Sequence, residues 1–345
     1  MELIESIIYI PILSAFLTFL MIKLSQKTGI FIDDIDKTHG LHKKATPRSG
    51  GIAIYLSSIF VMSNPLGVSL YIASLPIFLA GFFEDLLKNI PPKIRFIFMA
   101  LSAFLGIVLL NAIVFDIGYI KFHIIFALLF TIIGVVGIVN AVNLIDGLNG
   151  LASGVAIFTF LSFAYVSYIY NDVDILFVSL VLAMATAGFF VFNFPKGLIF
   201  LGDSGSYFLG FMLAELSILM VNRHPEISPW FPLVLLIYPV WETLFSILRR
   251  KLFEKRSSFA PDNNHLHCIL CKKINSNPIS SIFLLLIVFG IDIIAVLFKE
   301  NTQILTITAL IFAISYTFFY ILFNLNTERV EKIRKMVYKL IYAYK

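Results

Sequence analysis

The chain is short of charged residues and almost without cysteine. Only 14% of its 345 residues are Asp, Glu, Lys or Arg, whereas a soluble domain carries about a quarter. This shortage excludes an ordinary soluble protein. The two cysteines, Cys268 and Cys271, are expected on the cytosolic side, where a structural disulfide is not expected. Residues 1–24 also lack a basic leader and carry Glu2 and Glu5, so they are read as a retained first span, not a cleaved signal.

Long hydrophobic runs take the place of the missing charges. Hydrophobic residues make up 59% of the chain, and several runs reach the roughly 20 residues that a bilayer core about 30 Å thick requires. We therefore predict an all-α, multi-pass membrane protein with about eleven transmembrane helices. Their expected ranges are 3–24, 50–64, 67–83, 94–115, 123–142, 151–170, 174–193, 206–221, 229–248, 279–298 and 302–323.

The basic residues predict how the chain is oriented. If the spans alternate in direction, only Lys121, Arg223 and Lys299 of the 26 Lys and Arg residues fall on one side. By the positive-inside rule, the N-terminus is then outside, the C-terminus is cytoplasmic, and the longer polar loops face the cytosol. We attribute the net charge of +5 to the membrane topology and to affinity for anionic lipid, not to nucleic-acid binding.

No internal repeat divides the chain, so residues 1–323 are predicted to form one membrane-embedded domain. Residues 324–345 form a basic tail with apolar residues at helical spacing, which predicts an amphipathic helix on an anionic cytoplasmic leaflet. The alternative is a solvated basic tail.

A conspicuous polar motif is FLGDSGSYFLG, residues 200–210. Asp203 lies between two glycines just before a span, where backbone N–H groups can approach an anion. A carboxylate in this setting fits Mg²⁺ shared with a substrate phosphate, because Mg²⁺ prefers oxygen ligands. The alternative is that Asp203 only caps the helix.

Two further acidic groups are expected at the same membrane face. In NAVNLIDGLNG, polar residues recur every three positions, so Asn140, Asn143, Asp146 and Asn149 share a face if the span stays helical. The alternative there is polar capping between two spans. Glu84-Asp85 ends another span and is followed by Lys88, Lys93 and Arg95, which can neutralise phosphate. A solvated loop of mixed charge is the alternative for this second group.

The loop 249–278 supplies bases and imidazoles. Arg249, Arg250, Lys251, Lys255 and Arg256 predict a basic entrance for an anionic substrate. His265 and His267 are expected to contact phosphate or sugar oxygens, with a zinc site including Cys268 and Cys271 as the alternative.

Three acids lie inside predicted spans. Glu242 is a candidate site residue, because a buried acid in a membrane span is costly. Glu215 and Asp292 have no assigned role beyond helix packing.

Six motifs occur in order along the chain: HKKATPRSGG, GFFEDLLKNIPPKIR, NAVNLIDGLNGL, FLGDSGS, WETLFSILRR and PDNNHLHCIL. Together they resemble the polyprenyl-phosphate N-acetylhexosamine-1-phosphate transferase family. The resemblance is closer to its undecaprenyl-phosphate N-acetylglucosamine-1-phosphate transferase branch than to its phospho-N-acetylmuramoyl-pentapeptide transferase branch. The resemblance implies a cytosolic active-site cleft in the cytoplasmic (inner) membrane. It implies transfer of a sugar 1-phosphate, GlcNAc-1-phosphate here, from a UDP-sugar to undecaprenyl or another polyprenyl phosphate. The resemblance further implies that UMP is released and that this step starts lipid-linked cell-wall or lipopolysaccharide glycan synthesis.

The resemblance also implies roles for individual residues. Mg²⁺, or alternatively Mn²⁺, would be held by Asp203, Asn143 and Asp146, and the catalytic carboxylates would be Asp85, Asp146 and Asp203. Phe200 would stack on uracil. The other implied substrate-binding residues are Lys43, Arg48, Glu84, Lys93, Asn143, Glu242, His265 and His267. A homodimer is compatible with the family but is not indicated by the chain.

The sequence departs from the family pattern at two positions. Glu84 stands where an aspartate is usual, and Cys268 where the N-acetylglucosamine branch usually has a histidine, which leaves the sugar open. Direct attack by the lipid phosphate is the favoured mechanism, with attack by an aspartate first as the alternative.

Rival functions from other classes are a transporter or flippase, and a non-catalytic assembly protein. The intramembrane acids are the reason to consider a transporter, which predicts an internal repeat and midplane charges from both halves. The sequence shows no repeat, and its polar clusters gather at one face.

Overall fold

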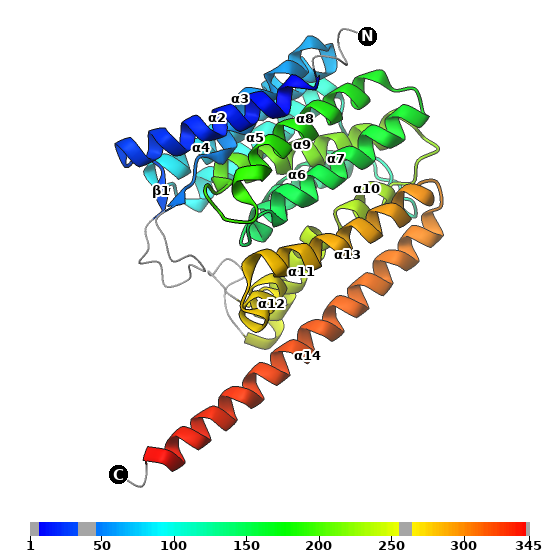
Figure 1. Cartoon of the computed structure of the whole chain (residues 1–345). Coiled ribbons are helices and arrows are strands. Elements are labelled where there is room, and N and C mark those ends of the chain that lie inside the picture. Colours follow the sequence, from blue (N-terminus) through cyan, green and yellow to red (C-terminus); the bar gives the residue numbers. More distant parts are fainter. Residues whose placement is uncertain (1–6, 34–45, 255–263, 343–345) are drawn as a thin grey trace.

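The computed structural model describes residues 7–33, 46–254 and 264–342, and these residues are mainly helical (Figure 1). The first elements are α2 (Tyr9–Thr28), β1 (Ile32–Asp33), β2 (Thr46–Pro47), α3 (Gly50–Ser57), η1 (Ser58–Ser63), α4 (Pro65–Leu87), α5 (Pro92–Leu110) and α6 (Ile124–Ile145). The remaining elements are α7 (Leu151–Ile169), α8 (Val173–Asn193), α9 (Gly202–Arg223), α10 (Trp230–Leu235), α11 (Ile237–Arg249), η2 (Arg250–Glu254), α12 (Leu266–Ile274), α13 (Asn277–Leu297) and α14 (Thr302–Tyr342).

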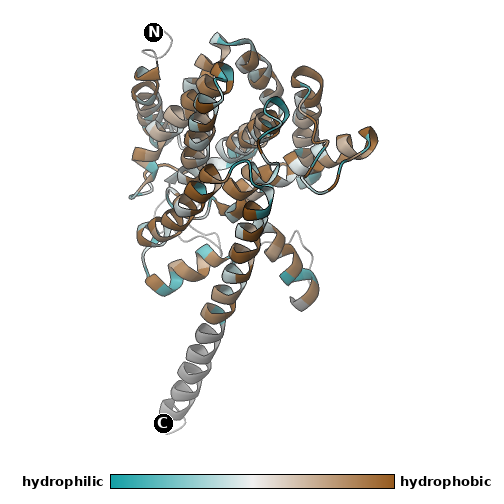
Figure 2. Cartoon of the chain, turned by 90° about the vertical axis from the view of Figure 1, so that its right-hand side faces the viewer, coloured by the Kyte–Doolittle hydropathy of each residue, from teal (hydrophilic) through white to brown (hydrophobic). Residues whose placement is uncertain are grey.

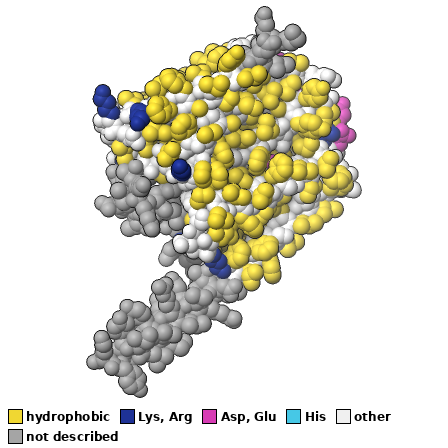
Figure 3. All heavy atoms as spheres, in the orientation of Figure 1, with side chains coloured by type: hydrophobic (Ala, Val, Ile, Leu, Met, Phe, Trp, Pro, Cys, Tyr) yellow, Lys and Arg dark blue, Asp and Glu magenta, His cyan; other side chains and the backbone are white. Residues whose placement is uncertain are grey.

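Nine helices of the described chain are long and apolar enough to cross a membrane: α2, α4–α9, α13 and the first part of α14. Helices suit this environment because each backbone N–H and C=O finds its partner inside the segment. Figure 2 shows the bundle as largely hydrophobic ribbon, and in Figure 3 the visible face is an apolar band with charged side chains near its two ends. A multi-pass, helical membrane protein is therefore confirmed.

Two of the eleven expected spans are not continuous membrane-length helices. Residues 50–63 form α3 and the 3-10 helix η1, a short apolar segment. Residues 230–249 break at Leu236 into α10 and α11, in a stretch that carries Pro232 and Pro239, and proline removes a helical hydrogen bond. The count of eleven and the orientation in the membrane stay predictions, and β1 pairing with β2 is a small addition to the all-α expectation.

Helix α9 is the centre of the bundle, with 94% of its membrane-length window buried. It packs against α4 and α6, and α4 comes unusually close at Gly81, where an added Cβ would lie 2.5 Å from the backbone of Ser204. This close approach brings the end of α4 against the first turn of α9, where the polar motifs meet.

Helix α14 continues without a break from the last span through Tyr342, beyond the bundle (Figure 1). The tail from residue 324 is therefore helical as far as Tyr342, as the sequence predicts. Its position on a membrane surface stays a prediction.

Candidate active site at the start of α9

Asp203 lies in the first turn of α9 and is the centre of the candidate site. Its Oδ1 accepts hydrogen bonds from Arg48 Nη2 at 3.3 Å and from Asn143 Nδ2 at 3.2 Å. Arg48 precedes α3, and Asn143 lies in the last turn of α6. Three of the motifs singled out in the sequence thus meet at one carboxylate.

The second oxygen of Asp203 has two more partners. Arg95 Nη1 lies 3.2 Å from Oδ2, and the Tyr207 hydroxyl donates to Oδ2 at 3.0 Å. Arg95 also donates to the Tyr207 oxygen at 3.2 Å, which closes a ring of three groups. Tyr207 was missed by the sequence reasoning, although its position four residues after Asp203 on a helix would place both side chains on one face.

Asp85, at the end of α4, anchors the start of α9. Its two oxygens accept hydrogen bonds from the backbone N–H groups of Asp203 (2.8 Å) and Ser204 (2.9 Å) and from the Ser204 hydroxyl (2.7 Å). The first N–H groups of a helix have no partner within it, so a carboxylate from another helix can satisfy them. Asp85 is only 1% exposed, and its carboxylate is a structural anchor in this arrangement.

Glu84 points to a different set of partners. Its Oε2 accepts a hydrogen bond from the backbone of Ile90 at 2.8 Å, and its Oε1 lies 3.9 Å from Arg95 Nη1. The reading of Glu84-Asp85 as a solvated loop is therefore wrong, since both acids are engaged at the edge of the cluster.

Asp146 immediately follows α6 and faces the same cluster. It interacts electrostatically with Arg48, Asp203, Asp85 and His267, and burial raises the pKa of its carboxyl well above the usual value. Among the described residues, its carboxylate has no hydrogen-bond or ion-pair partner. Among the described acids of this cluster, Asp146 is therefore the one whose carboxylate oxygens can bind a ligand without losing a protein partner.

The other two amides of the 140–149 motif do not join the site. Asn140 Nδ2 donates to the carbonyl of Val136 at 2.7 Å, and Asn149 Nδ2 donates to the carbonyl of Pro195 at 3.0 Å. The four polar residues are expected to share one face if the span stays helical, and this condition is not met, because α6 ends at Ile145 before Asp146 and Asn149.

A second cluster surrounds Glu242 in α11. Glu242 is fully buried, and its Oε1 lies 3.1 Å from His265 Nδ1 and accepts the Leu266 N–H at 3.3 Å. His265 Nδ1 also lies 3.0 Å from the Ser246 hydroxyl. The structure thus brings Glu242 and the histidine motif together, as distant parts of one predicted site.

His267 connects the two clusters. A Cβ placed on Gly147 would lie 2.8 Å from its Nε2, so its ring packs on the turn that follows Asp146. Burial acts to lower the pKa of His267, but Cys268 and the Glu242 carboxylate outweigh it and raise the pKa to about 10. A positive imidazolium therefore faces the Asp146 turn at neutral pH.

Several basic residues that were predicted at the site are buried, face outward or lie outside the described residues. Arg249 and Arg250 are buried, so they do not form an open basic entrance, and Arg250 Nη2 lies 3.5 Å from His265 Nε2. Lys93 is exposed in the first turn of α5, where Arg95 makes the contacts with the cluster instead. Lys251 lies in η2 and is exposed. Three other candidates, Lys43, Lys255 and Arg256, lie outside the described residues.

Phe200 is half-buried just before α9. Its N–H donates to the Pro47 carbonyl at 2.8 Å, and its own carbonyl accepts from Gly50 at 3.0 Å. These backbone bonds fix the segment that carries Phe200 beside the start of α3. The uracil-stacking role of Phe200 stays a prediction.

The donor set of the site suits a hard cation shared with a ligand. No group of three His, Cys, Asp or Glu side chains within the described ranges is arranged to hold a metal by itself. However, the open carboxylate of Asp146 lies near Asp203 and Asn143, which are oxygen donors of the kind Mg²⁺ prefers, and Mg²⁺ is commonly completed by substrate phosphates and water. These residues fit a Mg²⁺ ion that binds together with a phosphate ligand.

The fold and the site together define a multi-pass membrane protein with a carboxylate, arginine and histidine cluster at one end of its helices. Residues 67–221 match the family model described as glycosyl transferase family 4. A relative from Thermotoga maritima, an undecaprenyl-phosphate alpha-N-acetylglucosaminyl 1-phosphate transferase, is 31% identical over 76% of this chain and 80% of its own length. The chain belongs to glycosyl transferase family 4.

Two further relatives show which branches are similar. A probable undecaprenyl-phosphate N-acetylglucosaminyl 1-phosphate transferase of Bacillus subtilis is 29% identical over 86% of each chain. A phospho-N-acetylmuramoyl-pentapeptide-transferase of Streptococcus pneumoniae is 29% identical over 67% of this chain and 74% of its own. The first type of relative aligns over more of the chain, which agrees with the branch indicated by the motifs.

Proposed function

We propose that this chain transfers GlcNAc-1-phosphate from UDP-GlcNAc to undecaprenyl phosphate and releases UMP, as the first step of a lipid-linked envelope glycan. The observation that carries the proposal is the Asp203 cluster, which unites Arg48, Asp85, Arg95 and Asn143 from four separate segments in a chain similar to transferases of this name. The names of those relatives give undecaprenyl phosphate and the N-acetylglucosaminyl 1-phosphate group, whereas the UDP donor comes from the resemblance of the motifs.

The lipid acceptor fits a site at the end of membrane helices. Its hydrocarbon tail can lie in the bilayer while its phosphate stays near the surface, beside the start of α9. A phosphate monoester has a second pKa near about 6, so the attacking oxygen is already largely anionic at neutral pH. In the proposed step a bond forms from this oxygen to the sugar-bearing phosphorus, and the bond to the UMP oxygen breaks.

Asp146, Asp203 and the side-chain oxygen of Asn143 would hold Mg²⁺, which when bound supplies positive charge that stabilises UMP as the leaving group. Arg48 and Arg95 hold the Asp203 carboxylate in place and add positive charge for the pyrophosphate. His267 adds a further cation next to Asp146.

The geometry favours direct attack over an aspartyl intermediate at Asp85. Both Asp85 oxygens accept hydrogen bonds from the first turn of α9, so neither is free to attack the phosphorus. We therefore assign Asp85 the role of positioning Asp203.

The proposed location is the inner membrane, with the site on the cytosolic face.

The test is UMP release by purified protein in detergent with undecaprenyl phosphate, Mg²⁺ and UDP-GlcNAc, compared with UDP-N-acetylmuramoyl-pentapeptide. We expect lipid-dependent UMP release with UDP-GlcNAc, a loss of about 10²–10³-fold for Asp203→Asn, and loss with EDTA that added Mg²⁺ restores. Release with the muramoyl-pentapeptide donor alone would reassign the sugar. No release with either donor from folded protein would overturn the proposal.

A further inference from the structure

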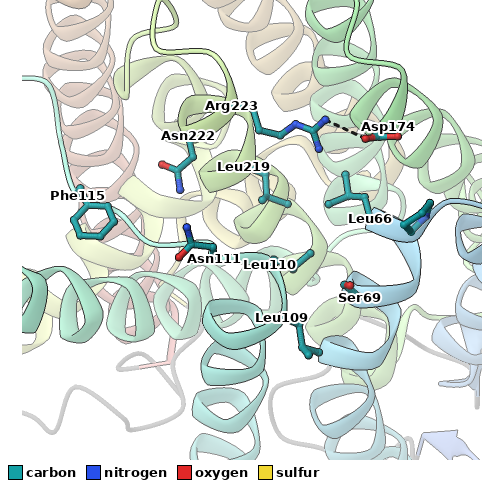
Figure 4. Close-up of a pocket in the computed structure, with 11 residues that line it drawn as sticks. Leu66, Ser69, Leu109, Leu110, Asn111, Phe115, Asp174, Leu219, Asn222 and Arg223 are labelled. Carbon is teal, nitrogen blue, oxygen red and sulfur yellow. Dashed lines mark hydrogen bonds and ion pairs between the residues drawn. The ribbon is translucent and has the colours of Figure 1, made fainter.

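A second polar site lies at the opposite end of the helices that carry the Asp203 cluster. It is an open pocket of about 700 Å³ between the far ends of α4, α5 and α9 (Figure 4). Helix α9 runs from Gly202 to Arg223, and its 22 residues span about 33 Å. The pocket and the Asp203 cluster are therefore separated by about one membrane thickness.

One side of the pocket carries Arg223 and Asp174, and a second carboxylate, Asp172, is buried behind Arg223. Arg223 Nη2 lies 3.0 Å from Asp174 Oδ2, and Arg223 Nε lies 2.8 Å from Asp172 Oδ2 (Figure 4 draws the first pair). Asp172 is buried and also lies 3.0 Å from His224 Nε2, whereas Arg223 and Asp174 are partly exposed at the pocket. The Nη1 group of Arg223 donates to no residue in the described part of the chain, so it is open to a ligand.

The rest of the pocket combines apolar walls with amides. Leu66, Leu109 and Leu110 line it, together with Leu219 of α9. The Asn222 side chain donates to the Ile113 carbonyl at 3.0 Å, which leaves its own oxygen as an acceptor. A ligand that fits must therefore carry both a charged head and a hydrocarbon part, as a membrane lipid does.

We infer that this pocket binds the headgroup of a zwitterionic phospholipid. The lipid phosphate would accept hydrogen bonds from Arg223 Nη1, its ammonium would lie against Asp174, and an acyl chain would follow the leucines. An anionic lipid would gain the same contact with Arg223 but would lack a cation for Asp174. This inference is independent of the proposed transferase activity, since none of these residues belongs to the Asp203 cluster.

The test is native mass spectrometry of delipidated protein titrated with phosphatidylethanolamine or phosphatidylglycerol. We expect phosphatidylethanolamine to bind about tenfold more tightly, a difference of about 1.4 kcal/mol. Asp174→Asn should remove this preference, because it deletes the negative charge and keeps an oxygen acceptor for the Asn64 side chain, which now donates to Asp174 at 2.7 Å.

A matched pair of variants locates the binding. Ser69 lines the pocket and Ser162 does not; both are half-buried helix serines whose side chains make no hydrogen bond within the described residues. Ser69→Phe fills the pocket and should abolish the preference, whereas Ser162→Phe should retain it. Equal binding of the two lipids, an unchanged preference in Ser69→Phe, or full displacement of lipid by equimolar glycerophosphoethanolamine would overturn the inference.

Discussion

Arg95 and Lys93 lie two residues apart at the start of α5, yet only Arg95 reaches Asp203. A spacing of two positions on a helix turns side chains to different faces, so one basic residue meets the carboxylates and the other faces outward. A sequence pattern shows that basic residues follow Glu84-Asp85 but not which of them is turned inward. The contact partner is set by how α5 is rotated against α9.

We expect Arg95→Ala to reduce transfer by about 10²-fold or more, because it leaves Asp203 and Tyr207 without their shared cation. Lys93→Ala, in the same first turn of α5, is the control and should stay within about threefold of the parent, since an exposed charge contributes little. The measurement is the initial rate of UMP release at saturating donor. Equal losses in the two variants would show that Arg95 acts only through the general charge of the region.

The raised pKa of His267 gives a stability prediction. Its pKa in the fold is about 10, against an ordinary value of 6.5, so the folded state holds the imidazolium more tightly than the unfolded state does. The stabilisation is fully present below pH 6.5 and is lost as the pH rises toward 10. We expect the thermal midpoint of the parent in detergent to fall over this interval, and His267→Gln to fall less. Parallel curves for the two proteins would contradict the raised pKa.

The candidate site could be predicted at the level of residue types, but not of partners. Asp203 and Asn143 stand out as polar residues at the ends of apolar runs, whereas Arg48 is expected only from the family resemblance. Tyr207 cannot be recognised as a site residue from the sequence, because a tyrosine in a membrane span usually has only a helix-packing role. The amino-acid sequence alone does not indicate that Asp85 binds backbone N–H groups of another helix, because this depends on the close contact of α4 with α9.

At the scale of elements, the junction into α9 depends on one backbone conformation. Gly202 has φ +76°, and an added Cβ would lie 2.5 Å from the Arg48 carbonyl and 2.6 Å from Asp85 Oδ2. The left-handed region costs a non-glycine residue about 1–2 kcal/mol, before any cost of displacing Asp85. The Asp85 anchor therefore needs glycine here.

We expect Gly202→Ala to lower the thermal midpoint and to reduce transfer, because the alanine pushes Asp85 away from the α9 N–H groups. Gly134→Ala in α6 is the matched control: a Cβ there meets nothing within 4 Å, and alanine favours helix by about 0.5–1 kcal/mol. Thermal unfolding in detergent and the rate of UMP release check both variants. A Gly202→Ala protein as stable and active as Gly134→Ala would show that the Asp85 contacts are dispensable.

Most helices follow from the sequence because a long apolar run has only one good solution in a bilayer. Residues 230–249 are an exception. They are apolar enough to be predicted as one span, but the helix breaks at Leu236, between two prolines. The second helix, α11, then directs Glu242 toward His265. Hydrophobicity does not report such a break, whereas the proline positions give a partial signal.

At the scale of the whole molecule, the contacts separate the loops into two groups. Arg48, Asp85, Arg95 and Asn143 meet at Asp203, whereas Asn64, Asp172, Asp174 and Arg223 meet at the other end of the bundle. The loops that the basic residues assign to the cytosol thus supply the first group. The side of the membrane itself stays a prediction from the distribution of Lys and Arg.

Cysteine labelling can decide this orientation, because the two native cysteines are buried and should give little background. Lys121→Cys replaces a side chain that is 87% exposed beyond α5, and Lys27→Cys replaces an exposed lysine in the last turn of α2. With the N-terminus outside, a membrane-impermeant maleimide should label Lys121→Cys in intact cells, and Lys27→Cys only after permeabilisation. The reverse pattern would place the Asp203 cluster on the outer face, where a cytosolic nucleotide sugar has no access, and would therefore exclude the proposed reaction in the cell.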